Sequence, residues 1–157
     1  MRIYDSLTDR LRNQHEAIFN MIESLDEAQV MARPEPGKWS IHDNITHLAR
    51  YQPVFLERIN AILQLRDPVF NAYRAEYDPD FETWRSWDTQ YLLGKLDGDR
   101  REIFDLITGL GDDELSRVGI HKKRGRLTVI DWAEFFVLHE AHHIYTIFRL
   151  AHTGEPE

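Results

Sequence analysis

The chain has 157 residues, a formal net charge of -8 at pH 7 and no cysteine. This length suits one domain with a proper core, so we expect a single domain over residues 1–157. The acidic balance argues against nucleic acid as a partner, because phosphate binding needs a basic face.

Apolar residues at helical spacing predict a first helix over Ile3–Leu25 and a second over Ile41–Leu65. A segment with two prolines and a glycine separates them and should form a turn. The following stretch, residues 66–82, has two Asp-Pro steps and no sustained period. Because adjacent antiparallel helices usually have short links, this stretch predicts a long crossover connection.

A third helix should begin near residue 83 or 88 and end at 108, and a fourth should span about 128–152. Between them, residues 118–128 predict a short excursion with a turn at the basic run KKRGR. This run is either a solvated tip or a means of steering an anionic ligand. Two capping boxes are expected, each with a hydroxyl residue three positions before an aspartate: Ser40 with Asp43, and Thr128 with Asp131.

Four long helices, two short breaks and one long crossover predict an all-α four-helix bundle. A long link between the second and third helices usually means that those two run parallel. The second helix would then be antiparallel to the fourth.

The predicted fourth helix carries His139 and His143 one above the other on the same face. Trp132, Phe136 and Ile147 share that face, which directs both imidazoles toward the core. Such a pair is half of a divalent-metal site, and any further ligand must be histidine or carboxylate because cysteine is absent. The alternative is a pair of core histidines that are hydrogen-bonded to neighbours.

The candidates for a third ligand are His47, His15, His42 and His121. In the antiparallel arrangement His47 lies within one turn of the depth of His143, whereas His42 would lie at the helix mouth. We therefore predict that His47, His139 and His143 converge. Their nearest ring nitrogens should lie within about 4 Å of one another, as ligands roughly 2.0 to 2.1 Å from one ion require.

The segment from His139 to His143 also satisfies H-E-x-x-H, the metalloprotease pattern in which Glu140 would be the general base. The extended form of that pattern asks for glycine at 146 and histidine at 149, where this chain has Thr146 and Arg149. The protease interpretation is therefore disfavoured. Glu140 and His142 do not stack on the proposed ligands, and each has either a supporting role beside them or a packing or surface role.

The segments KWSIHDNITHLARYQ and HEAHHIYTI together resemble the DinB-like superfamily of small helical proteins, which includes thiol S-transferases. The matching features are a Trp-Ser entry into the second helix, a later His-Leu pair and a final H-x-x-x-H: Trp39, Ser40, His47, Leu48, His139 and His143. The resemblance implies an up-down-down-up bundle with a three-histidine metal site, often with zinc or nickel. It also implies that the protein forms dimers.

These features predict a metal-dependent enzyme in which the ion activates water or the sulfur of a small thiol. The reaction would transfer a small thiol to an electrophile or hydrolyse a small substrate. The alternatives are a non-catalytic module that binds metal or a small ligand, and a bundle without metal.

The N-terminal residues lack the apolar run of a signal peptide, and no stretch reaches the roughly 18 apolar residues of a membrane span. We therefore expect a cytoplasmic location and no membrane partner. Trp84, Trp87 and the aromatic residues between Phe70 and Phe81 cannot all belong to the core, so we also expect a homodimer.

Overall fold

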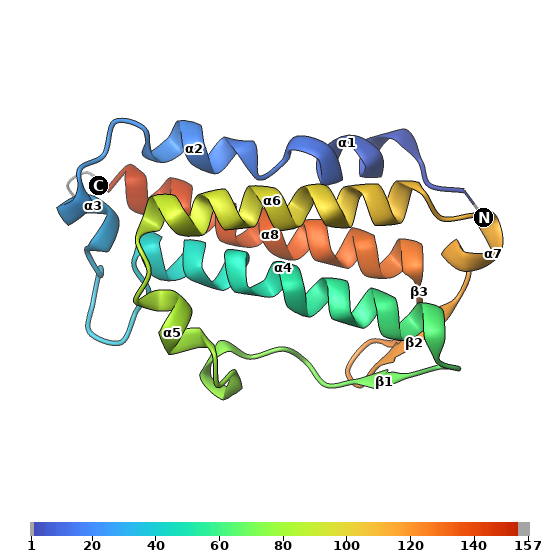
Figure 1. Ribbon diagram of the computed structural model, residues 1–157. Helices are drawn as coiled ribbons and strands as arrows, with labels where there is room; N and C mark the ends of the chain where they lie inside the picture. The colour runs from blue at the N-terminus through green and yellow to red at the C-terminus, as the bar shows by residue number, and fades with distance from the viewer. Residues whose placement is uncertain (1, 154–157) are drawn as a thin grey trace.

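Four helical rods lie side by side in the computed structural model, which describes residues 2–153 (Figure 1). The first rod consists of two helices, and the other three are single long helices. Their bounds are Asp5–Asn13 (α1), Glu16–Ile22 (α2), Ile41–Gln64 (α4), Thr89–Thr108 (α6) and Val129–Ala151 (α8). Short helices lie in the connections at Glu27–Met31 (α3), Phe81–Arg85 (α5) and Asp112–Leu115 (α7). The body of the molecule is thus the helical bundle that the sequence predicts.

Helix α4 lies at the centre of the packing. It contacts α6, α8 and α5, whereas α1 packs on α6 and α8, and α2 packs on α8. Between α4 and α8 the buried rings of Phe55 and Phe136 stack, with centroids 4.2 Å apart. The two helices that carry the candidate ligands are therefore held face to face by their apolar sides.

The prediction of one continuous helix over Ile3–Leu25 is wrong, because the chain turns at Gln14 and His15. The N–H of Ile18 bonds to the carbonyl of His15, only three residues back, which tightens the backbone at this point. Gln14 turns its side chain toward α8 and donates from Nε2 to the carbonyl of Val137 at 2.8 Å. Polar contacts within the bundle, which no local pattern reveals, accompany the break.

Both predicted capping boxes are confirmed, and they begin the two helices that carry the candidate ligands. The Ser40 hydroxyl accepts from the N–H of Asp43 at 3.0 Å, and the Asp43 carboxylate accepts from the N–H of Ser40 at 2.9 Å. Thr128 and Asp131 form the same reciprocal pair at the start of α8. Each helix also ends within one residue of its predicted end.

A small sheet lies at one end of the bundle and corrects the all-α prediction (Figure 1). Its strands are Val69–Phe70 (β1), Val118–His121 (β2) and Gly125–Thr128 (β3). Strand β2 is central, parallel to β1 and antiparallel to β3. The predicted excursion is thus a β-hairpin, and Gly125, with a φ of 82°, allows its turn.

The sheet approaches the bundle closely at Gly119 in β2. A Cβ atom at this position would lie 2.7 Å from the side chain of Ile62 in α4. The Trp132 indole in α8 donates to the carbonyl of Gly119 at 3.3 Å. Glycine is therefore required here by the close approach of the strand to both helices.

The connection between α4 and α6 runs back along the bundle, so α6 begins at the same end of the molecule as α4 (Figure 1). It contains β1, the 3-10 helix Ala75–Tyr77 (η1) and α5. Phe81 and Trp84 are buried, whereas Tyr77 is 77% exposed, so the aromatic residues of this region do not all belong to the core and the homodimer stays a prediction. In the described part of the chain, no helix is long and apolar enough to cross a membrane.

Candidate metal centre

The structure brings together His47 from α4 with His139 and His143 from α8, and we call these three residues the histidine cluster. The Nε2 atoms of His47 and His139 are 3.0 Å apart. One ring nitrogen from each residue lies within 4.8 Å of the other two, a looser limit than the 4 Å expected. His47 is only 5% exposed, so it faces α8 and not solvent.

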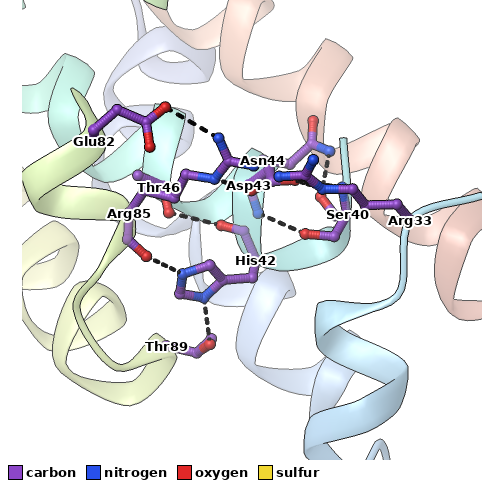
Figure 2. Close-up of polar contacts among 9 residues, drawn as sticks. All are labelled: Arg33, Ser40, His42, Asp43, Asn44, Thr46, Glu82, Arg85 and Thr89. Atoms are coloured by element: carbon purple, nitrogen blue, oxygen red, sulfur yellow. Dashed lines mark hydrogen bonds and ion pairs between the residues drawn. The ribbon is translucent and has the colours of Figure 1, made fainter. Parts of the chain in front are cut away.

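The orientation of His143 is set by Asn44, one turn before His47 on α4. Asn44 Nδ2 donates to the carbonyl of Ser40 at 2.8 Å (Figure 2), and this bond leaves the amide oxygen of Asn44 for His143. The oxygen lies 2.9 Å from His143 Nδ1 and accepts its hydrogen. Because Nδ1 carries the hydrogen, Nε2 of His143 keeps a free lone pair.

Further polar contacts fix the start of α4 (Figure 2). The Asp43 carboxylate pairs with Arg33 at 3.2 Å and with Arg85 at 2.8 Å. His42 accepts from the Thr89 hydroxyl at 2.6 Å and donates from Nε2 to the carbonyl of Arg85 at 2.8 Å. Both ring nitrogens of His42 are thus engaged, so this candidate joins α4 to the α5–α6 region and does not belong to the histidine cluster.

All three imidazoles of the histidine cluster are neutral at pH 7. Burial lowers the pKa of His47 to about 2, of His143 to about 3 and of His139 to about 4, from an ordinary value of 6.5. Repulsion from neighbouring histidines acts in the same direction for each ring. Neutral imidazole is the form that binds a metal ion, so burial prepares these side chains for coordination.

Aromatic rings enclose the histidine cluster on the sides of α4 and of the crossover. The Trp39 ring lies 5.1 Å from that of His47, and the Tyr73 ring stacks on His47 at 5.6 Å. Tyr51 lies 5.0 Å from His139. These apolar faces exclude water from most of the cluster, which explains the strong effect of burial on the imidazole pKa values.

Glu140 belongs to a buried polar network on another face of α8. Its carboxylate pairs with Arg100, and both side chains are 1% exposed. Gln14 also donates to Glu140 at 3.0 Å. His15, another candidate ligand, binds Asp97 at 2.9 Å and accepts from Arg100 at 3.4 Å. A carboxylate with these partners is not free to act as a general base, so the H-E-x-x-H pattern is not a protease site here.

The remaining histidines with open roles also lie outside the histidine cluster. His121 in β2 accepts the backbone N–H of Lys123 at 3.1 Å, and His142 is exposed on α8. Neither is among the residues whose ligand atoms converge. Within the described residues, the histidine cluster is the one group of three or more potential metal ligands whose ligand atoms lie close together.

The histidine cluster fits a divalent cation by its chemistry. It offers three neutral nitrogen donors and no thiolate, a donor set that suits zinc, nickel and related ions. Nitrogens about 2.1 Å from one ion lie at most about 4.2 Å apart. A tetrahedral site holds such nitrogens about 3.4 Å apart, so a pair at the 4.8 Å limit would close by about 1.4 Å on binding the ion. The geometry is consistent with a divalent metal and does not identify it.

The fold and the site define a class, a four-helix bundle with a three-histidine cluster between two of its helices. The family model of the DinB superfamily matches residues 10–147, and the chain belongs to this superfamily. A comparison with curated proteins found no match.

Among the solved structures that match, two illustrate the shared fold. One is YfiT from Bacillus subtilis, described as a probable metal-dependent hydrolase with an unusual four-helix bundle topology. It has a TM-score of 0.80 at 20% identity, over 94% of this chain and 85% of that one. The other is an uncharacterized protein from Clostridium difficile 630, with a TM-score of 0.65 at 15% identity, over 96% and 95% of the chains. At these identities the likeness concerns the fold alone.

Sequence reasoning missed two residues that support the histidine cluster. Asn44 precedes His47 by three positions, so the helical period could have placed its amide on the same face. Tyr73 lies in the crossover, where no period exists, and its hydroxyl is held by the Asp78 carboxylate at 2.6 Å. Only the course of the crossover over α4 brings this ring to the cluster.

Proposed function

We propose that this protein is a metal-dependent enzyme that acts on a small molecule at the histidine cluster. The observation that carries the proposal is the convergence of three neutral imidazoles between α4 and α8. A bound divalent cation lowers the pKa of a water molecule or thiol at its open position, which supplies a nucleophile near neutral pH. The description of YfiT as a probable metal-dependent hydrolase supports hydrolysis as one reaction of this class.

The chain's own residues would hold and orient the ion. His47, His139 and His143 would each donate through a ring nitrogen, and Asn44 would keep the hydrogen of His143 on Nδ1. Trp39 and its aromatic neighbours would keep bulk water away from the buried side of the site. Two reactions fit this arrangement, namely hydrolysis of a small substrate and transfer of a small thiol to an electrophile.

Metal content and turnover test the proposal together. Protein purified without a histidine tag should contain close to one zinc or nickel ion per chain by elemental analysis. It should also turn over activated esters or amides, or conjugate a small thiol to an electrophile. His139→Gln should abolish metal and turnover, whereas His142→Gln, an exposed histidine on the same helix, should keep both.

Each negative result has a definite meaning. Protein that takes up no divalent metal, even when zinc or nickel is added, would contradict the proposal. Bound metal without turnover in either assay would favour the alternative, a non-catalytic metal-binding module.

Three finer expectations belong to this proposal. The up-down-down-up order of the helices is supported by the crossover that returns along the bundle. A cytoplasmic location stays a prediction. The homodimer also stays a prediction, and light scattering would test it. It is supported by an apolar face along α8, where Leu138, Tyr145 and Phe148 are exposed.

A further inference from the structure

A pocket of about 240 Å³ lies beside the histidine cluster and shares His139 with it. Four cationic side chains line this pocket: Arg58, Arg74, Lys123 and Arg124. Among the described residues, no aspartate or glutamate lines it. This is unusual for a chain with 27 acidic residues against 19 lysines and arginines. We call it the cationic pocket.

The small sheet assembles the cationic pocket from distant parts of the chain. Phe70 in β1 pairs with His121 in β2, and the N–H of Lys122 donates to the carbonyl of Phe70 at 3.0 Å. This parallel pairing places the crossover residues after Phe70 beside the hairpin turn, so Arg74 and Lys123 line one pocket.

Helices α4 and α8 continue the wall from the cationic pocket to the histidine cluster. On α4, Tyr51 lies one turn after His47, and Arg58 follows two turns later on the same face. On α8, Phe135 lies one turn before His139. The pocket and the cluster are therefore parts of one continuous surface.

Aromatic rings, and not carboxylates, face two cations of the cationic pocket: Arg58 lies 5.5 Å from the centre of the Phe70 ring, and Arg124 lies 4.7 Å from that of Phe135. Arg58 donates from Nη2 to the carbonyl of Asn71 at 2.9 Å, but its buried Nη1 has no hydrogen-bond partner. Among the described residues, no carboxylate pairs with Arg58, Lys123 or Arg124. Arg58 is partly buried and the other three cations are exposed, and an anion in the pocket would accept charge-assisted hydrogen bonds from them.

The contrast within the hairpin is informative. Arg126, two residues beyond Arg124, pairs with Asp67 at 3.1 Å outside the pocket. Arg74 reaches Glu76 only at 4.0 Å, and both of these side chains are at least half exposed. The acidic partners that this chain supplies elsewhere are thus not supplied in the pocket.

We propose that the cationic pocket binds the anionic group, a carboxylate or a phosphate, of the small molecule on which the histidine cluster acts. This inference rests on the proposed function. The anion would accept hydrogen bonds from the arginines, and the rest of the molecule would extend over His139 toward the cluster. A volume of about 240 Å³ lies below the roughly 300 to 1,000 Å³ of sites for drug-sized ligands, which suits a pocket that receives only the anionic end of the substrate.

Titration calorimetry with inorganic phosphate and with malonate tests the pocket, in 0.15 M salt, on both the zinc-loaded and the chelated protein. The test variant is Lys123→Gln/Arg124→Gln. The control is Lys122→Gln/Arg126→Gln, which removes the same two charges from the same hairpin outside the pocket. All four residues are exposed, so both variants should fold.

The wild type should bind at least one probe with and without zinc. The test variant should bind it at least about tenfold more weakly, because charge-assisted hydrogen bonds are lost, and the control should change less than about twofold. The probe that binds more tightly, malonate or phosphate, indicates whether the anionic group of the substrate is a carboxylate or a phosphate. The proposal that the pocket binds an anion would be overturned by any of three results. These are no binding of either probe, equal weakening in both variants, and binding only to the zinc-loaded protein. If instead the proposed metal site is wrong, elemental analysis will show no bound metal, whatever the calorimetry shows for the cationic pocket.

Discussion

Replacement of a single candidate ligand should uncouple metal binding from stability. If zinc is present at 100 times its dissociation constant, it adds about 2.7 kcal/mol to the free energy of unfolding. For a chain of this length, 1 kcal/mol moves the melting temperature by about 2 to 4 °C, so the expected shift is about 8 °C. If His143→Gln weakens binding about 100-fold, the same zinc concentration adds only about 0.4 kcal/mol, or about 1 °C.

The assay is thermal unfolding by circular dichroism at pH 7.5, with zinc and after chelation, of the wild type and two variants. His142→Gln is the matched control because it makes the same substitution at the neighbouring, exposed position. It should keep the full zinc shift, whereas His143→Gln should lose it and differ little from wild type after chelation. If chelation does not shift the thermal unfolding curve of the wild type, although metal was bound beforehand, then metal binding at the histidine cluster does not stabilise the fold and the prediction is wrong.

Three further predictions concern stability. The pKa of each imidazole in the histidine cluster is lower in the folded chain than the unfolded value of about 6.5, so stability is full above pH 6.5 and falls as the pH drops toward the folded values of about 4 to 2. Between pH 7.5 and 5.5 the free energy of unfolding of chelated protein, measured with urea, should fall by up to about 1.4 kcal/mol per ring, or about 4 kcal/mol for the three rings. A variant with glutamine at all three positions should lack this pH dependence. If its free energy of unfolding falls equally with pH, the prediction is refuted. Glu140→Gln should lower the free energy of unfolding in urea by about 3 to 5 kcal/mol, because it leaves Arg100 buried without its counter-charge. Glu134→Gln removes the partner of the partly exposed Arg10 and should lower it by under about 1 kcal/mol. Similar losses in the two variants would count against the buried network. Gly119→Ala should cost about 1 to 3 kcal/mol, since its Cβ would press on Ile62, and an unchanged urea midpoint would contradict the close approach.

Local signals in the sequence were sufficient for the helices that carry the histidine cluster. Capping boxes at Ser40 and Thr128 depend on residues three positions apart, and they begin α4 and α8 where predicted. The spacing of His139 and His143 on one apolar face also depends only on the helical period. His47 needed one assumption about tertiary structure, the antiparallel relation of the two helices, and matching depth then brought it to the other two.

The remaining features depend on contacts between residues that lie far apart in the chain. Strand β1 has two residues, too few for any period, and exists because Phe70 pairs with His121. The break at Gln14 accompanies polar contacts to α8, although apolar residues continue at helical spacing on both sides. The cationic pocket likewise needs the sheet to bring the crossover beside the hairpin turn. Periodicity and capping report only on neighbours along the chain, so the sequence by itself determined the two helices and their histidines, and the tertiary structure alone decided what surrounds them.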